Sequence, residues 1–187
     1  METKEWTLSK VYQMALNHQL EGIMFHNKAE KYMAFLGLEH MSDLQHCQYR
    51  AESEDLHKTE KIFLNKHDLM LIAQREAGDE DDIIPREAFS TKASSVGQEF
   101  KRKALAGFID QWSDWETSTE KLYAAIAAWC IEHQCSDYIH FQHLLENVCK
   151  EKMIIHDLER EMVISGWELC ACENIAFVTH KHMMYNN

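Results

Sequence analysis

Apolar side chains recur along most of the chain at alternating spacings of three and four residues, the period of an amphipathic α-helix. Breaks in this pattern predict four long helices, at about residues 5–36, 42–75, 98–133 and 137–165. Gly37 and Leu38 separate the first two, and Ser42 is the expected cap of the second. A short turn near residue 136 separates the last two. The pattern therefore predicts an all-α fold made of two helical hairpins.

A long connection lies between the second and third predicted helices, at about residues 76–97. It holds an acidic run, the only proline of the chain and several small polar residues, which are typical of a segment outside regular structure. Such a connection lets the second and third helices run parallel, as in bundles with one long crossover. We expect residues 1–187 to form a single domain, a four-helix bundle that ends in a short C-terminal segment at 167–187.

The composition agrees with a helical domain and disfavours several functional classes. The 187 residues include six glycines and one proline, so helix breakers are few. A net charge of −12 disfavours nucleic acid and anionic membranes as partners. No apolar run reaches the roughly 18 residues of a membrane span, and the N-terminus lacks the apolar core of a signal peptide. We therefore expect a cytoplasmic protein whose six irregularly spaced cysteines stay reduced.

A carboxylate and an imidazole share one face of the second predicted helix. Glu54 and His57 are three residues apart, and Glu21 lies 33 residues before Glu54 on the first helix. Folding the two helices back on each other about the turn near residue 38 places the three side chains at one depth. A buried carboxylate must be paired, protonated or bound to a cation. A Glu on one helix with a Glu-x-x-His on its neighbour is half of the set that holds two irons inside a four-helix bundle.

The second hairpin supplies further carboxylates but no second Glu-x-x-His. Glu116 and Glu120 lie one turn apart on the third predicted helix, about as far before the turn near residue 136 as Glu151 and His156 lie after it. Glu151 can therefore face either Glu116 or Glu120. His156 lies near Glu116 in the first of these pairings. Met153 stands three residues before His156, where a second Glu-x-x-His would need a carboxylate.

Two stretches of the chain resemble the first two helices of non-haem bacterial ferritins: LEGIMFHNKAEKYMAFLGL (residues 20–38) and LQHCQYRAESEDLHKTEKIF (residues 44–63). Residues 115–153 resemble the third and fourth ferritin helices, so the resemblance covers nearly all of the chain outside the segment from about 66 to 100. It implies a ferritin-like fold in which Glu21, Glu54 and His57 bind a first iron. Glu54 would bridge to a second iron near Glu116, and one more glutamate would come from the fourth helix.

Two lysines depart from the ferritin pattern. Lys152 stands at the position of the expected fourth-helix glutamate, with Glu151 beside it, and Lys28 replaces a tyrosine. A lysine ammonium at that place would repel the second metal ion. Three alternatives stay open: Glu151 takes over as the ligand, the second site is empty, or Lys28 and Lys152 pair with the core carboxylates in place of a metal. Two irons per chain are expected, with one or none as alternatives.

The resemblance implies a ferroxidase, in which iron and dioxygen react at a diiron carboxylate site inside the bundle. Storage of the product would need a hollow homo-oligomer. The expected metal ligands are Glu21, Glu54, His57, Glu116 and Glu151, with Glu120 and His156 as further candidates. One alternative is a rubrerythrin-like diiron oxidoreductase, although this chain lacks the second Glu-x-x-His of such a site. Another is a non-catalytic ferritin-like scaffold with a degenerate site.

Overall fold

The computed structural model describes residues 6–74, 84 and 91–186, which form an all-α structure. Four long helices make up the bundle: α1 (Leu8–Leu36), α2 (Glu39–His67), α3 (Gln98–Glu132) and α4 (Tyr138–Ile164). A 3₁₀ turn, η2 (Ala93–Ser95), precedes α3, and a shorter helix, α5 (Leu169–Asn186), follows α4. The predicted fold class is therefore confirmed. In the described part of the chain, no helix has the length and apolar character needed to cross a bilayer.

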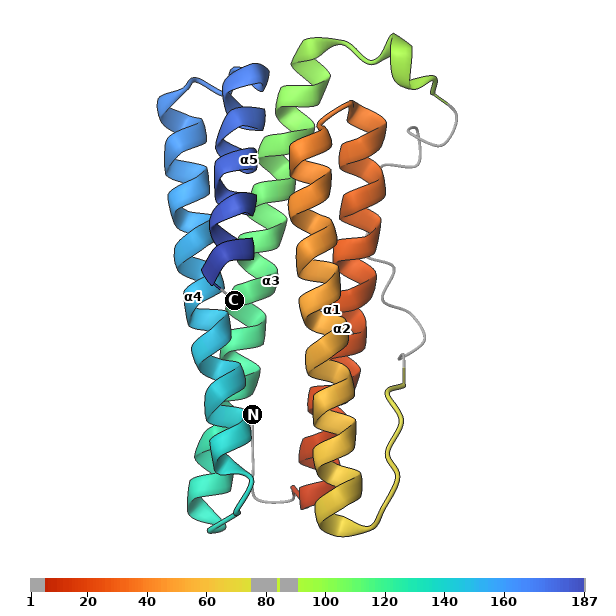
Figure 1. Cartoon of the computed structure of the whole chain (residues 1–187), viewed down its shortest axis with the longest axis vertical. Coiled ribbons are helices and arrows are strands. Elements are labelled where there is room, and N and C mark those ends of the chain that lie inside the picture. Colours follow the sequence, from red (N-terminus) through yellow and green to blue (C-terminus); the bar gives the residue numbers. More distant parts are fainter. Residues whose placement is uncertain (1–5, 75–83, 85–90, 187) are drawn as a thin grey trace.

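The long helices form two antiparallel hairpins, α1 with α2 and α3 with α4 (Figure 1). Because α2 ends and α3 begins at opposite ends of the bundle, these two helices point the same way (Figure 1). The first residues after α2 return along α1, where the Gln13 side-chain amide donates to Ile72 O (2.8 Å). Gln74 N–H donates in turn to Asn17 Oδ1 (2.8 Å). Most of the predicted crossover, at 75–83 and 85–90, lies outside the described residues.

The turn between α1 and α2 depends on Gly37. This residue has φ 71°, a left-handed conformation that glycine adopts at low cost because it has no Cβ. Its N–H donates to Ala34 O (2.9 Å), and Leu38 N–H donates to Met33 O (2.9 Å). These bonds satisfy carbonyls at the end of α1 and turn the chain into α2, as the break in the sequence pattern predicted.

The predicted bounds of the second helix, 42–75, are wrong at both ends. α2 begins at Glu39, and the Ser42 hydroxyl donates to Glu30 O (3.0 Å) instead of capping the helix. At the other end, Asp68 takes φ 52° and its N–H closes the last turn on Leu64 O (3.0 Å). The apolar residues beyond Asp68 suggested a longer helix, but Leu71 packs against the core from the returning segment.

The core consists of two apolar clusters with a polar layer between them. One cluster lies towards the Gly37 turn and includes residues of α5, and the other lies towards the turn between α3 and α4. Between them each long helix brings polar side chains inward. We call this region the polar layer; its fully buried members are Gln19, His26, Gln45, Gln48, Thr59, Glu116 and Thr119. Burying polar groups is costly unless they are satisfied, so this layer is where a functional site is expected.

Glu173 of α5 caps the beginning of α2. Its carboxylate accepts hydrogen bonds from the N–H groups of His40 (2.9 Å) and Met41 (3.1 Å). The N-cap residue of α2 is Leu38, whose apolar side chain cannot accept these bonds. The negative charge is also favourable at a helix N-terminus. Glu173 therefore ties α5 to the α1–α2 hairpin.

Replacing Glu173 by alanine is expected to lower the free energy of unfolding by about 1–2 kcal/mol, because two N–H groups of α2 lose their acceptor. Asn174→Ala, at an exposed neighbour on α5, is the control and should change stability by less than about 0.5 kcal/mol. Urea denaturation followed by circular dichroism measures both. Equal values for the two variants would show that the cap does not stabilise the fold.

Candidate metal centre

The inward face of α2 carries Glu52 and Asp55 instead of Glu54 and His57. Its buried and half-buried polar positions follow the helical spacing of three and four: Gln45, Gln48, Glu52, Asp55 and Thr59. Glu54 and His57 are exposed. Each lies two residues beyond an inward position and so about 200° further around the helix. The prediction that these two side chains face the bundle interior is wrong.

On the second hairpin, Glu116 and Glu151 face the interior. Glu116 is 1% exposed. The Glu151 carboxyl lies near enough to it that the charge of Glu116 raises the pKa of Glu151. Lys152 forms an ion pair with Glu120, with both side chains about one-third exposed. The His156 side chain is 73% exposed. Of the arrangements considered for the fourth helix, the structure has the one in which Glu151 faces Glu116.

On α1, Gly22 and His26 line the interior instead of Glu21. The Glu21 side chain is 31% exposed, and its Oε2 lies 3.9 Å from Nδ1 of His18. Gly22, the next residue, is buried and faces α2: a Cβ added there would lie 2.9 Å from Cδ of Glu52 and 3.0 Å from its Oε1. His26 follows one turn later and is 1% exposed. The interior grouping of Glu21 with Glu54 and His57 is therefore absent from the described structure.

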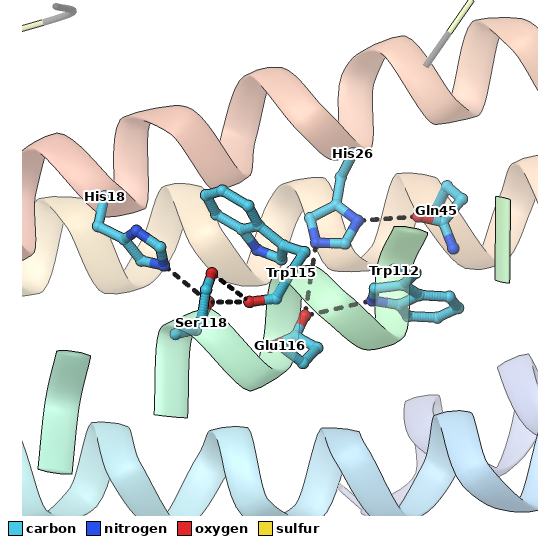
Figure 2. A network of polar contacts seen from close by, with 8 residues as sticks. His18, His26, Gln45, Trp112, Trp115, Glu116 and Ser118 are labelled. Carbon is cyan, nitrogen blue, oxygen red and sulfur yellow. Dashed lines mark hydrogen bonds and ion pairs between the residues drawn. The ribbon is translucent and has the colours of Figure 1, made fainter. Parts of the chain in front are cut away.

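His26 presents a bare ring nitrogen to Glu116 (Figure 2). Its Nδ1 lies 2.8 Å from Oε1 of Gln45, which can only accept, so Nδ1 carries the hydrogen. Burial lowers the pKa of His26 to about 4, so the ring is neutral near pH 7 and Nε2 keeps a free lone pair. Nε2 lies 3.9 Å from Oε1 of Glu116 and has no hydrogen-bond partner among the described residues.

Glu116 is likewise only partly satisfied. Its Oε1 accepts a hydrogen bond from the indole N–H of Trp112 (3.2 Å), while Oε2 has no partner within the described part of the chain (Figure 2). Two acceptors that face each other in a dry core need a proton or a cation between them, and 3.9 Å is too long for one shared hydrogen bond. Histidines that bind metals usually donate their other N–H to an oxygen acceptor, as His26 does to Gln45.

Four carboxyl groups share this interior: Glu52, Asp55, Glu116 and Glu151, here called the carboxylate cluster. Burial, and then the charges of Glu116 and Asp55, raise the pKa of Glu52 well above its usual value. Burial and the other three charges do the same to the pKa of Glu151. Burial also raises the pKa of Glu116 to about 7. The metal-free cluster therefore retains protons near neutral pH, and a bound cation would displace them.

Neutral groups surround the carboxylate cluster on the side of the α3–α4 turn. Gln19 Nε2 donates to Thr59 Oγ1 (3.1 Å), whose hydroxyl donates to the carbonyl oxygen of Asp55 (2.8 Å). Since that hydroxyl hydrogen is used, His140 Nε2–H donates to Thr59 Oγ1 (3.0 Å). Burial lowers the pKa of His140 to about 4 and raises the pKa of Tyr123 well above its usual value. All of these side chains are uncharged near pH 7, so they cannot neutralise the cluster.

The donor chemistry of the carboxylate cluster and His26 fits iron or manganese, but the ligands do not converge as they stand. Carboxylates with an imidazole are the donors of diiron and dimanganese sites in helical bundles. Within residues 6–74, 84 and 91–186, no three His, Cys, Asp or Glu side chains are placed to hold one ion. Metal binding therefore requires the carboxyl groups to approach one another, which in the absence of a metal they can do only while they keep their protons.

Sequence reasoning missed Glu52, Asp55 and His26 because a short motif was given more weight than the helical register. The Glu-x-x-His spacing of Glu54 and His57 belongs to the outer face of α2. A signal for the inner face was present in the sequence. Counting from the buried Leu44 in steps of three and four leads to Gln48, Glu52, Asp55, Thr59 and the buried Phe63.

Comparison with protein-family models, curated protein sequences and solved structures finds no match in any of the three. A functional proposal for this chain therefore depends on its own residues.

Replacing Glu116 by glutamine should change how stability depends on pH. Between its usual value of 4.5 and its raised pKa of about 7, the Glu116 carboxyl binds more protons in the folded than in the unfolded protein. This contribution makes the free energy of unfolding fall as pH rises through that window. Glu116→Gln removes this contribution. The free energy of unfolding of the variant, relative to that of the wild type, should therefore rise by roughly 3 kcal/mol between pH 4.5 and pH 7.5.

The measurement is urea denaturation of the metal-free proteins, with a chelator, at several pH values across this window. Glu132→Gln, at an exposed position of the same helix, is the control. Its free energy of unfolding should differ from that of the wild type by the same amount at every pH. A constant difference for Glu116→Gln as well would mean that this carboxyl ionises normally in the folded protein.

Proposed function

We propose that the protein binds iron at the carboxylate cluster and oxidises it there with dioxygen. The observation that supports this most directly is the pair formed by His26 and Glu116. Both side chains are 1% exposed, yet Nε2 of His26 and Oε2 of Glu116 lack a hydrogen-bond partner among the described residues. A neutral imidazole lone pair beside the buried Glu116 carboxyl is satisfied well by a cation placed between the two groups.

The proposed ligands come from all four long helices. His26 lies on α1, Glu52 and Asp55 on α2, Glu116 on α3 and Glu151 on α4. A ferritin-like site is likewise built from all four helices of a bundle with one long crossover. This chain differs by having Glu-x-x-Asp in place of Glu-x-x-His on α2 and by taking its imidazole from α1. The residues suggested by the sequence motif lie outside this ligand set: Glu21, Glu54, His57, Glu120 and His156.

The cluster carries enough charge for two divalent ions. Four ionised carboxylates would neutralise two Fe(II), so two irons per chain is the proposed stoichiometry. Anionic oxygen ligands also favour Fe(III) over Fe(II), because Coulomb attraction grows with the charge of the ion. Two Fe(II) ions would each give up one electron, and one dioxygen would take both electrons and two protons to become hydrogen peroxide. The raised pKa values of Glu52 and Glu151 mean that these carboxyls release protons when iron binds.

A non-catalytic bundle is the second candidate, and two observations favour it. As the described side chains stand, no three metal-binding groups converge on one position. Lys152 replaces the glutamate expected from the ferritin pattern, and it forms an ion pair with Glu120. In such a bundle, protons retained by the raised pKa values would keep the carboxylate cluster uncharged without a metal.

Iron loading of matched variants tests the proposal. Glu52→Gln and Glu54→Gln make the same isosteric change two residues apart on α2, once at the inner and once at the outer face. After anaerobic addition of Fe(II), the wild type and Glu54→Gln should retain about two irons per chain on the size-exclusion peak. Glu52→Gln should retain fewer than one, because it removes a ligand. Admission of air should then consume about one dioxygen per two irons.

Each other outcome has a clear meaning. Loss of iron in Glu54→Gln but not in Glu52→Gln would support the set on the outer face and contradict the proposal. A wild type that retains no iron would identify the chain as a non-catalytic bundle. Iron that is bound but consumes no dioxygen would limit the function to metal binding.

A further inference from the structure

Gly22 provides the space that the carboxyl group of Glu52 occupies. A Cβ at residue 22 would lie 2.9 Å from Cδ, 3.0 Å from Oε1 and 3.3 Å from Cγ of Glu52, so the Glu52 side chain would have to shift. Gly22 is the one glycine in the 29 residues of α1. Glycine in a helix interior is less favourable than alanine, so its presence needs a reason. The reason given by the contacts is the Glu52 carboxyl on the facing helix.

We propose that Gly22 is a positioning residue that gives the Glu52 carboxyl a resting place against α1, from which it must swing inward to bind a metal ion. This inference rests on the proposed function. It assigns to Gly22 a role in setting the affinity of the site, although glycine itself has no side chain that could touch the metal.

The carboxyl groups of the cluster repel one another whenever two of them are ionised, and this repulsion explains why a resting place matters. Like charges in a poorly solvated interior repel strongly, and the repulsion weakens with distance. Glu52 lies closer to the α1 backbone at residue 22 than a Cβ at that position would allow. A cation at the centre would reverse the sign of the force and draw the carboxylate inward. The resting place therefore stabilises only the metal-free protein.

A group that stabilises only the metal-free protein weakens metal binding by the same factor, because the two equilibria are linked. Gly22 thus weakens metal binding and makes release of the metal ion easier. An ion that is a substrate and must leave after oxidation is better served by such a site than by one with ligands fixed in place. The same movement accounts for the finding that, among the described residues, no three ligands converge in the structure.

Gly22→Ala tests this inference, with Gly107→Ala as the matched control. Both glycines lie inside long helices, but a Cβ at Gly107 has nothing within 4 Å. The probe is Fe(II), titrated anaerobically into the full-length metal-free protein and followed by calorimetry. Gly22→Ala should bind Fe(II) about tenfold more tightly than the wild type, because the methyl group removes the resting place from the metal-free state. Gly107→Ala should bind as the wild type does.

A second arm tests the contact without any metal. In the metal-free proteins, Gly22→Ala should be less stable to urea than Gly107→Ala. In a Glu52→Ala background, which removes Cδ and Oε1, the deficit should vanish and both alanines should stabilise the helix alike. A deficit that persists in that background would overturn the inference, since the methyl group would then clash elsewhere.

The results separate this inference from the proposed function. If the wild type binds Fe(II) and Gly22→Ala binds it more weakly, Glu52 acts from its present position; the inference fails and the proposed function stands. Unchanged affinity in Gly22→Ala has the same consequence. If the wild type binds no Fe(II), both fail together.

Discussion

Four carboxyl groups lie buried or half-buried in the middle of one bundle, where they repel one another whenever they are ionised, and this constrains the rest of the structure. Apolar clusters on either side exclude water, so the charges are poorly screened. Two buried imidazoles of this region, His26 and His140, remain neutral because their own burial disfavours the charged form. Two lysines, Lys58 beside Asp55 and Lys152 beside Glu116, offset part of the charge, and protons or an added cation must compensate the rest. A helical bundle selected for stability alone would replace these groups with leucine, which would fill the space without such a cost.

The periodicity of the sequence was sufficient for the fold but not for the site. A helix of about seven to ten turns repeats its apolar pattern many times, so α3 and α4 begin and end within a residue of their predicted bounds. Gly37 ended α1 as expected, because its left-handed backbone can be read from the residue type. By contrast, Ser42 looked like a cap in the sequence and is not one. The true cap, Glu173, belongs to a helix more than a hundred residues away, which local reasoning cannot find.

The site needed the rotation of each helix, which a motif of two residues does not determine. Glu52-x-x-Asp55 and Glu54-x-x-His57 overlap in one segment, and both have the spacing of neighbours on a helix face. Only the burial of the flanking apolar residues decides between them. On α4 the choice between Glu151 and Lys152 is a rotation of about 100°, and there the structure turns the carboxylate inward. Lys152 stays at the rim, where its charge still lowers the pKa of Glu116. The lysine that seemed to silence the site therefore favours ionisation of a carboxylate within it.

The capping of α2 by Glu173 has a consequence for the order in which the fold is completed. Its carboxylate and the His40 amide from which it accepts a hydrogen bond are 133 residues apart in the sequence. The α1–α2 hairpin is synthesised before α5, yet the start of α2 has this acceptor only when α5 has been made and has docked. Opening of α5 would in turn expose the first turn of α2 to solvent exchange. The start of α2 and α5 thus belong to one cooperative unit, in which loss of α5 destabilises the first turn of α2.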